Sequence, residues 1–199
     1  MTRVLVILPA LNEGKNIATA ITQIQSHMPT ADVLVINDGS NDDTTQQAES
    51  CGAIVLDMPY NVGIGAAVQT GFKFAAQHGY DVVVRNDGDG QHAPDGIHGL
   101  LDHIMSDAAD VVIGSRFIGD HGDYGTPIAR RLGITILSTL LSKITGQTIT
   151  DPTSGFCAFN RKAILLFPQH YPHDYPEPEA LVISHRTGLR QIEVPVTMK

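Results

Sequence analysis

The chain has 199 residues and a mass of 21.4 kDa, which suits one ordinary domain. Hydrophobic residues make up 42% and charged residues 17%, and this composition excludes a disordered protein. Acidic residues outnumber basic ones by 21 to 13, which argues against a nucleic-acid-binding surface.

Short apolar runs alternate with longer helical patterns along the first part of the chain. The expected strands are residues 4–8, 33–36, 54–56, 82–84 and 111–113. The expected crossover helices are residues 16–27, 44–50, 64–78 and 94–106. Continuous apolar runs of this length are typical of parallel strands that are buried on both faces. The alternation therefore predicts an α/β fold, with a mostly parallel central sheet and helices on both faces.

A further amphipathic helix is predicted over residues 126–146. Its apolar stripe consists of Ile128, Leu132, Ile136, Leu140 and Ile144, joined by Leu137 and Leu141, and the opposite face carries Arg130, Arg131, Thr135, Ser138 and Ser142. The stripe by itself favours a helix that packs against the core. The arginines near the start also suit peripheral contact with lipid headgroups, although no segment reaches the about 20 apolar residues that span a bilayer.

The charge is uneven along the chain. Residues 1–115 hold 4 basic and 14 acidic side chains, whereas residues 116–199 hold 9 and 7. This split is consistent with chance variation in a solvated surface. It is also consistent with an acidic metal site that is followed by an anion-binding half.

Polar residues cluster directly after three of the expected strands. The clusters are Pro9-Ala10-Leu11-Asn12-Glu13, Asn37-Asp38-Gly39-Ser40 and Asn86-Asp87-Gly88-Asp89-Gly90-Gln91-His92. Ligands of open parallel sheets bind beyond the carboxyl ends of the strands, so we expect the clusters at one edge. Asp87 and Asp89 can then hold Mg²⁺ or Mn²⁺ together with substrate phosphate oxygens. A solvated Asp-Gly turn is the alternative, whereas an EF-hand is excluded because His92 stands where its loop needs glycine.

A glycine-rich turn is predicted between the third strand and its helix. Asn61, Gly63 and Gly65 belong to it, but Val68 stands where a dinucleotide fingerprint requires its third glycine. A dinucleotide-dependent oxidoreductase is therefore a distant alternative. The turn suits either a close approach to a ribose or phosphate, or a simple tight loop.

Six short motifs follow one another along the chain. They are Pro9-x-x-Asn12-Glu13, Asn37-Asp38-Gly39-Ser40, Asn61-x-Gly63-x-Gly65-x-Ala67, Asp87-x-Asp89-x-Gln91-His92-x-Pro94, Gly114-Ser115-Arg116 and Thr153-Ser154-Gly155-Phe156. In this order they resemble the inverting glycosyltransferases of family 2, especially the dolichyl- and polyprenyl-phosphate sugar transferases of the dolichol-phosphate-mannose synthase type. The resemblance spans residues 4–196. It implies a glycosyltransferase A (GT-A) type fold and metal-dependent transfer from a nucleotide-diphosphate sugar, with a UDP-sugar preferred over GDP-mannose.

The resemblance also implies roles for individual residues. Around the nucleotide it implies Pro9, Ala10, Asn12, Glu13, Asp38, Gly39, Asn61, Gly65, Asp87, Gly88 and Asp89. For the Mg²⁺ or Mn²⁺ ion it implies Asp87, Asp89 and Gln91. On the acceptor side it implies Arg116, Arg130, Arg131, Thr135, Asp151, Ser154, Glu177 and Glu179. The residues expected to carry catalysis are Asp87, Asp89, Arg116 and Arg131.

The acceptor-side residues favour a polyprenyl phosphate over a sugar hydroxyl. A hydroxyl acceptor benefits from a carboxylate base, whereas an ionised phosphate needs cations that orient it. Arg116, Arg130 and Arg131 suit that role because guanidinium binds phosphate in bidentate fashion, although surface arginines are the alternative. A hydroxyl acceptor, with Glu177 or Glu179 as the base, also stays an alternative.

We expect residues 1–199 to form a single catalytic domain, with a nucleotide- and metal-binding half over 1–115 and an acceptor half over 116–199. Family members usually continue with a segment that closes over the diphosphate, and many add membrane helices, so we expect such a segment beyond Lys199. The expected location is the cytoplasmic face of a membrane, with the lipid surface or a membrane protein as partner. A non-catalytic nucleotide-sugar-binding module of a membrane complex is the remaining alternative.

Overall fold

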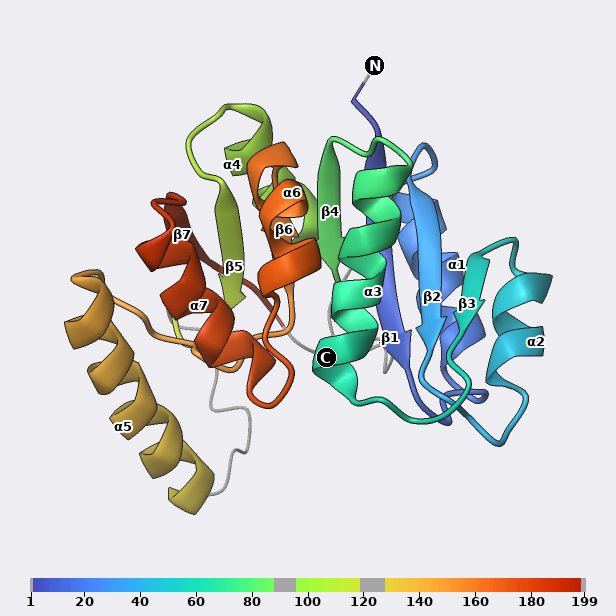
Figure 1. The fold of residues 1–199 in the computed structure, drawn as a ribbon, viewed down its shortest axis with the longest axis horizontal. Helices are drawn as coiled ribbons and strands as arrows, with labels where there is room; N and C mark the ends of the chain where they lie inside the picture. Colours follow the sequence, from blue (N-terminus) through green and yellow to red (C-terminus); the bar gives the residue numbers. More distant parts are fainter. Residues whose placement is uncertain (1, 88–95, 119–127, 198–199) are drawn as a thin grey trace.

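The structure is a computed structural model that describes residues 2–87, 96–118 and 128–197, and it is built on a seven-stranded sheet (Figure 1). The strands are β1 (Val4–Ala10), β2 (Asp32–Asn37), β3 (Ile54–Asp57), β4 (Val82–Arg85), β5 (Val111–Ser115), β6 (Cys157–Phe159) and β7 (Gln191–Pro195). Their order is β3-β2-β1-β4-β6-β5-β7, and β6 runs antiparallel to both of its neighbours. The other paired strands are parallel, so the predicted α/β sheet is confirmed.

Helices cover both faces of this sheet (Figure 1). They are α1 (Ile17–His27), α2 (Thr44–Ser50), α3 (Ile64–Gln77), α4 (Gly96–Met105), α5 (Ile128–Thr145), α6 (Arg161–His170) and α7 (Pro176–Arg186). Successive strand residues point to opposite faces. Leu5 and Ile7 of β1 therefore enter a core that is shared with α3, α6 and α7. Val6 and Leu8 enter a second core, which is shared with α1, α2 and α4.

The five predicted strands and four predicted crossover helices are confirmed, with ends that differ by at most two residues. In the second part of the chain, β6, α6, α7 and β7 were not predicted. The strand β6 has three residues and inserts between β4 and β5. This insertion brings the turn that precedes β6 next to the end of β4.

The helix α5 exposes most of its apolar stripe, so the prediction that the stripe packs against the core is wrong for those residues, whereas Leu137 and Leu141 do pack against the core. The exposed fractions are 61% for Leu132, 62% for Ile136, 53% for Leu140 and 46% for Ile144. The side chain of Ile128 lies outside the described residues. Leu141 is buried, and on the face predicted to be polar Ser142 Oγ accepts a hydrogen bond from Ile149 N at 2.9 Å. The helix therefore uses its serine-bearing side against the protein, and Figure 1 shows it standing apart from the sheet.

Candidate active site

The carboxyl ends of β1, β2 and β4 meet at one edge of the sheet, as predicted. Ala10 O, at the end of β1, accepts a hydrogen bond from Asp38 N at 2.8 Å, and Ile7 O accepts one from Asn86 N at 3.0 Å. The three polar clusters therefore begin side by side. Residues 88–95, which include most of the third cluster, lie outside the described residues.

The Asp38 carboxylate holds the loop between β3 and α3. It is buried, and its two oxygens accept hydrogen bonds from Val62 N at 2.7 Å and Gly63 N at 3.0 Å. Gly39 has a φ of 75°, and a Cβ there would lie 2.7 Å from Asn61 N. Glycine is therefore required where this turn closes on the loop.

A cavity of about 260 Å³ opens between the end of β1 and this loop. Its lining residues are Pro9, Ala10, Leu11, Asp38, Asn61, Gly63, Ile64 and Ala67. The walls are mostly apolar, and one buried carboxylate borders them. This combination suits a planar and partly polar group such as a nucleobase. Of the residues predicted at the nucleotide, the cavity brings together Pro9, Ala10, Asp38 and Asn61.

Three other residues predicted at the nucleotide make structural contacts outside this lining. Asn12 Oδ1 accepts a hydrogen bond from a backbone N–H after β2 at 2.9 Å, and Glu13 Oε2 accepts one from the Asn16 side chain at 2.8 Å. Gly65, at the start of α3, packs so closely on the chain that a Cβ would lie 2.5 Å from His173 O. The segment that leads into α7 therefore lies against the start of α3.

Asp87 follows β4 and has a side chain that is 34% exposed. Gly155 packs against it, because a Cβ at this glycine would lie 2.6 and 2.7 Å from the two carboxylate oxygens. A partly exposed carboxylate in such a cradle fits a hard cation such as Mg²⁺ or Mn²⁺. Gly88, Asp89 and Gln91 lie outside the described residues, and within the described ones no three acidic, histidine or cysteine side chains form a metal cluster.

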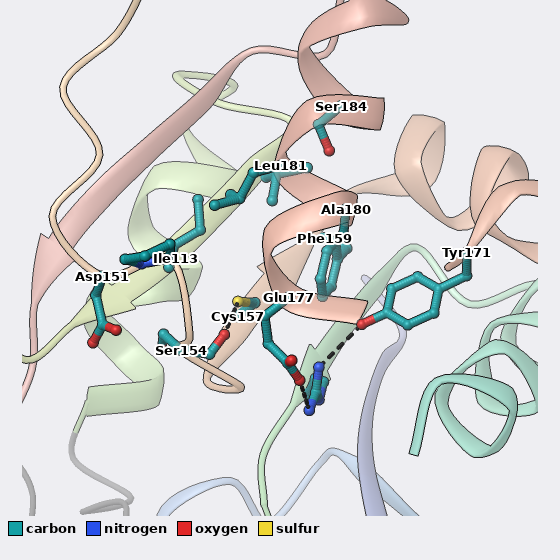
Figure 2. A pocket seen from close by; sticks show the side chains of 13 residues that line it. Ile113, Asp151, Ser154, Cys157, Phe159, Tyr171, Glu177, Ala180, Leu181 and Ser184 are labelled. Carbon is teal, nitrogen blue, oxygen red and sulfur yellow. Dashed lines mark hydrogen bonds and ion pairs between the residues drawn. The ribbon is translucent and has the colours of Figure 1, made fainter. Parts of the chain in front are cut away.

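A buried arginine that is not among the predicted site residues lies next to Asp87. Arg85 is the last residue of β4, and its Nη2 donates to Glu177 Oε1 at 2.6 Å while its Nη1 donates to Tyr171 Oη at 3.0 Å. Figure 2 shows the side chains of Tyr171 and Glu177 converging on this guanidinium. Burial raises the pKa of Tyr171 to about 12, so the phenol stays neutral. In the sequence, the feature that could have pointed to Arg85 is a charged residue at the end of an apolar run.

Glu177 and Glu179 lie in the first turn of α7 in different surroundings. Glu177 is half-buried and bonded to Arg85, whereas Glu179 is exposed. A carboxylate that accepts a charge-assisted hydrogen bond from a guanidinium is held in a fixed orientation. This pairing does not favour Glu177 as a general base, and it gives the residue a structural partner that sequence alone did not reveal.

Arg116 is held in place by Asp151, which is completely buried. Arg116 donates from Nε and Nη2 to the two carboxylate oxygens, each at 2.7 Å, and from Nη2 to Thr153 Oγ1 at 2.8 Å. Glu193 of β7 in turn accepts a hydrogen bond from Asp151 N at 3.0 Å. Because a bidentate pair fixes the guanidinium plane, Asp151 orients Arg116 instead of facing a ligand itself.

The remaining acceptor-side residues are divided between the interior and α5. The Ser154 hydroxyl donates inward to Gly114 O at 2.6 Å. Arg131 and Thr135 are exposed one turn apart on α5, and Thr135 Oγ1 donates to Arg131 O at 2.9 Å. The Arg130 side chain lies outside the described residues. An exposed arginine therefore adjoins the apolar stripe of α5.

The chain matches one family model and resembles several known proteins. The model of glycosyl transferase family 2 matches residues 5–166. The chain is 30% identical to a UDP-N-acetylglucosamine–dolichyl-phosphate N-acetylglucosaminyltransferase of Methanococcus voltae, over 96% of this chain and 83% of that protein. It is 32% identical to an undecaprenyl-phosphate mannosyltransferase of Micrococcus luteus, over 98% of this chain and 83% of the relative.

Solved structures give the same fold. A glucosyl-3-phosphoglycerate synthase of Mycobacterium tuberculosis superposes with a TM-score of 0.77 at 21% identity, over 100% of this chain and 71% of that one. The complex of that synthase with UDP gives a TM-score of 0.72 at 25% identity, over 98% and 71% of the two chains. The GT-A type fold expected from the sequence motifs is thereby confirmed.

Proposed function

Because the chain belongs to glycosyl transferase family 2 and is a glycosyltransferase, we propose that it transfers a sugar from a UDP-sugar to a polyprenyl phosphate with inversion. The main support for this proposal is the position of two features. A cavity suited to a nucleobase and the partly exposed Asp87 carboxylate lie at the same edge of the sheet. Ligands of parallel sheets bind at this edge.

The donor is a UDP-sugar in preference to GDP-mannose. The nucleobase would occupy the cavity beside Asp38, with the ribose toward the loop that contains Asn61. The Methanococcus voltae relative is named for a UDP-linked donor, and the 25% identical synthase structure holds UDP. These names support a uridine nucleotide for this chain.

A divalent ion, Mg²⁺ or Mn²⁺, would be held by Asp87 together with Asp89 and Gln91. The cradle at Gly155 and the exposure of Asp87 support this assignment. When bound, the ion would neutralise the departing nucleotide diphosphate as a Lewis acid. The chain's own task is to keep the Asp87 carboxylate correctly oriented.

The acceptor is a lipid phosphate, because the described part of the site offers cations that can orient it, and its half-buried carboxylate, Glu177, is already paired with an arginine. Arg116 is oriented by Asp151, and Arg131 is exposed with Thr135 on α5. Glu177 is engaged by Arg85 and would not take a proton from a hydroxyl. Both relatives are named for phosphorylated polyprenols, a dolichyl phosphate and an undecaprenyl phosphate. Residues 1–115 would then serve the nucleotide and residues 116–199 the acceptor.

The exposed stripe of α5 would rest on the cytoplasmic face of a membrane. Four large apolar side chains one turn apart face outward, beside Arg131. Such a face inserts at the headgroup boundary, and arginine is attracted to anionic lipids. In the described ranges, no helix combines the length and the apolar character that crossing a bilayer requires.

Calorimetric titration with UDP, GDP and NAD, each with and without MnCl₂, tests the donor site. We expect binding of UDP that tightens with Mn²⁺, and weaker or no binding of GDP and NAD. Binding of NAD alone would contradict the assignment and favour an oxidoreductase. Tight binding of UDP without turnover on any acceptor would favour a non-catalytic nucleotide-sugar-binding module.

A further inference from the structure

The Arg85 guanidinium faces two carboxylates at different distances. Its Nη2 atom lies 2.6 Å from Glu177 Oε1 and 3.6 Å from Asp87 Oδ1. The shorter distance is that of a charge-assisted hydrogen bond, and the longer one is an ion pair beyond hydrogen-bonding reach. The same nitrogen is therefore bonded to Glu177 and only attracted to Asp87.

Because the Arg85 side chain is buried, it matters which of the two carboxylates the guanidinium is bonded to. The Arg85 side chain is 4% exposed, and within the described residues its Nε has no hydrogen-bond partner. A buried guanidinium that loses an ionic partner has to find another, because an unpaired buried charge is costly. The nearby Tyr171 and Cys157 supply no negative charge, since burial raises the pKa of both groups. Among the residues that the structure describes, Asp87 is the other carboxylate that Arg85 faces, so Arg85 would turn toward it.

A turn of Arg85 toward Asp87 would affect the proposed metal site directly. Closing the gap from 3.6 Å to the about 2.8 Å of a charge-assisted bond would occupy a carboxylate oxygen. A cation needs the same oxygen lone pairs, and it would also be repelled by an uncompensated guanidinium. Glu177 prevents both effects while it holds Nη2.

On the basis of the proposed metal-dependent transfer, we propose that Glu177 is a positioning residue that keeps Arg85 away from Asp87 and so keeps Asp87 available to a divalent cation. Glu177 does so from α7, 92 residues further along the chain. The acceptor half therefore contributes to metal affinity in the nucleotide half without a metal ligand of its own.

The test compares UDP binding with and without MnCl₂ in the wild-type protein and four variants, by calorimetry, with melting temperatures as a fold control. Glu177→Gln keeps the size of the side chain and removes its charge. We expect the gain in UDP affinity from Mn²⁺ to fall by about tenfold or more, with unchanged UDP affinity in the absence of metal. Glu49→Gln, the same change at an exposed position of α2, is the matched control and should retain the full gain.

Rescue separates competition by Arg85 from a general loss of structure. The double variant Arg85→Met with Glu177→Gln has no guanidinium at position 85, so it should regain the Mn²⁺ effect that Glu177→Gln loses. Arg85→Met alone should retain the effect. Loss of the Mn²⁺ effect in the single Arg85→Met variant would overturn the inference even where Glu177→Gln fails to fold. Electron paramagnetic resonance of free Mn²⁺ in the same samples reports metal binding independently of activity.

The outcomes are distinct. A folded Glu177→Gln protein with the wild-type Mn²⁺ effect would overturn the inference, and so would loss of the effect in folded Arg85→Met. A double variant that stays as weak as Glu177→Gln would also overturn it, because the competitor would then be irrelevant. Absence of any Mn²⁺ effect in the wild-type protein would instead overturn the proposed metal-dependent function on which the inference rests.

Discussion

Substitution of Gly155 by alanine tests whether the Asp87 carboxylate depends on the cradle against which it packs. The added carbon would lie 2.6 Å from Oδ2 and 2.7 Å from Oδ1, whereas ordinary contacts begin at 3.4 Å, so the carboxylate has to retreat by roughly 0.8 Å. The cost in folding is small, about 0.5–1.5 kcal/mol for a side chain displaced from its rotamer. The effect on a metal is larger, because ligand distances are held to about 0.2 Å.

We therefore expect Gly155→Ala to weaken the Mn²⁺-dependent binding of UDP by about 10- to 100-fold, which is the usual range when the support of a metal ligand is disturbed. Calorimetry with and without MnCl₂ measures this loss, and a thermal scan should show a melting temperature within a few degrees of the wild type. Gly99→Ala is the matched control, because a Cβ there meets nothing within 4 Å on the exposed side of α4. It should retain Mn²⁺-dependent binding and add about 0.5–1 kcal/mol of stability. A Gly155→Ala protein with wild-type Mn²⁺ dependence would show that this glycine does not support a metal ligand.

Three further predictions concern the acceptor, the membrane and acid stability. Arg131→Ala should raise the KM for polyprenyl phosphate by about 10- to 150-fold, with little change in UDP affinity, because a hydrogen bond to a charged group contributes about 1.5–3 kcal/mol. Unaltered kinetics would contradict the assignment of Arg131 to the acceptor site. Replacing Leu132 and Ile136 by serine should reduce sedimentation with anionic vesicles without lowering the melting temperature, because both side chains are mostly exposed, and unchanged sedimentation would contradict the membrane face. Hydrogen bonds from Arg190 hold the pKa of Asp110 well below its usual range, so this group stabilises the fold above about pH 4 and loses that contribution as the pH falls further. Urea denaturation between pH 5 and pH 2 should therefore show a steeper loss of stability for the wild type than for Asp110→Asn, and equal slopes would contradict the assignment.

The elements of the first part of the chain could be predicted because buried parallel strands are continuous apolar runs. Val82 to Val84 and Val111 to Ile113 are of this kind. The strand β6 has three residues, and β7 is an edge strand that mixes Gln191 and Glu193 with apolar residues, so neither carries a clear period. The α5 stripe shows a second limit. Its four-residue spacing identifies a helix face but does not say whether protein, solvent or lipid covers it.

The candidate site was predictable where residues adjoin in sequence and not where they meet across the fold. Asp38 and Asp87 stand at strand ends, so topology alone places them at one edge. The contact of Arg85 with Glu177 joins residues 92 positions apart and depends on how α7 packs against the sheet. The bidentate hold of Asp151 on Arg116 depends in the same way on the insertion of β6. Such long-range ionic contacts leave no local pattern in the sequence.

Transfer of a sugar to a polyprenyl phosphate is tested most directly by mass spectrometry of lipid extracts, after incubation of the protein with MnCl₂, undecaprenyl phosphate and a panel of UDP-sugars and GDP-mannose. We expect a polyprenyl monophosphate that carries one sugar, formed from a UDP-sugar with release of UDP, and no such product from the Asp89→Asn variant. Product from GDP-mannose alone, or transfer to a sugar hydroxyl with no modification of the lipid phosphate, would contradict transfer from a UDP-sugar to a polyprenyl phosphate.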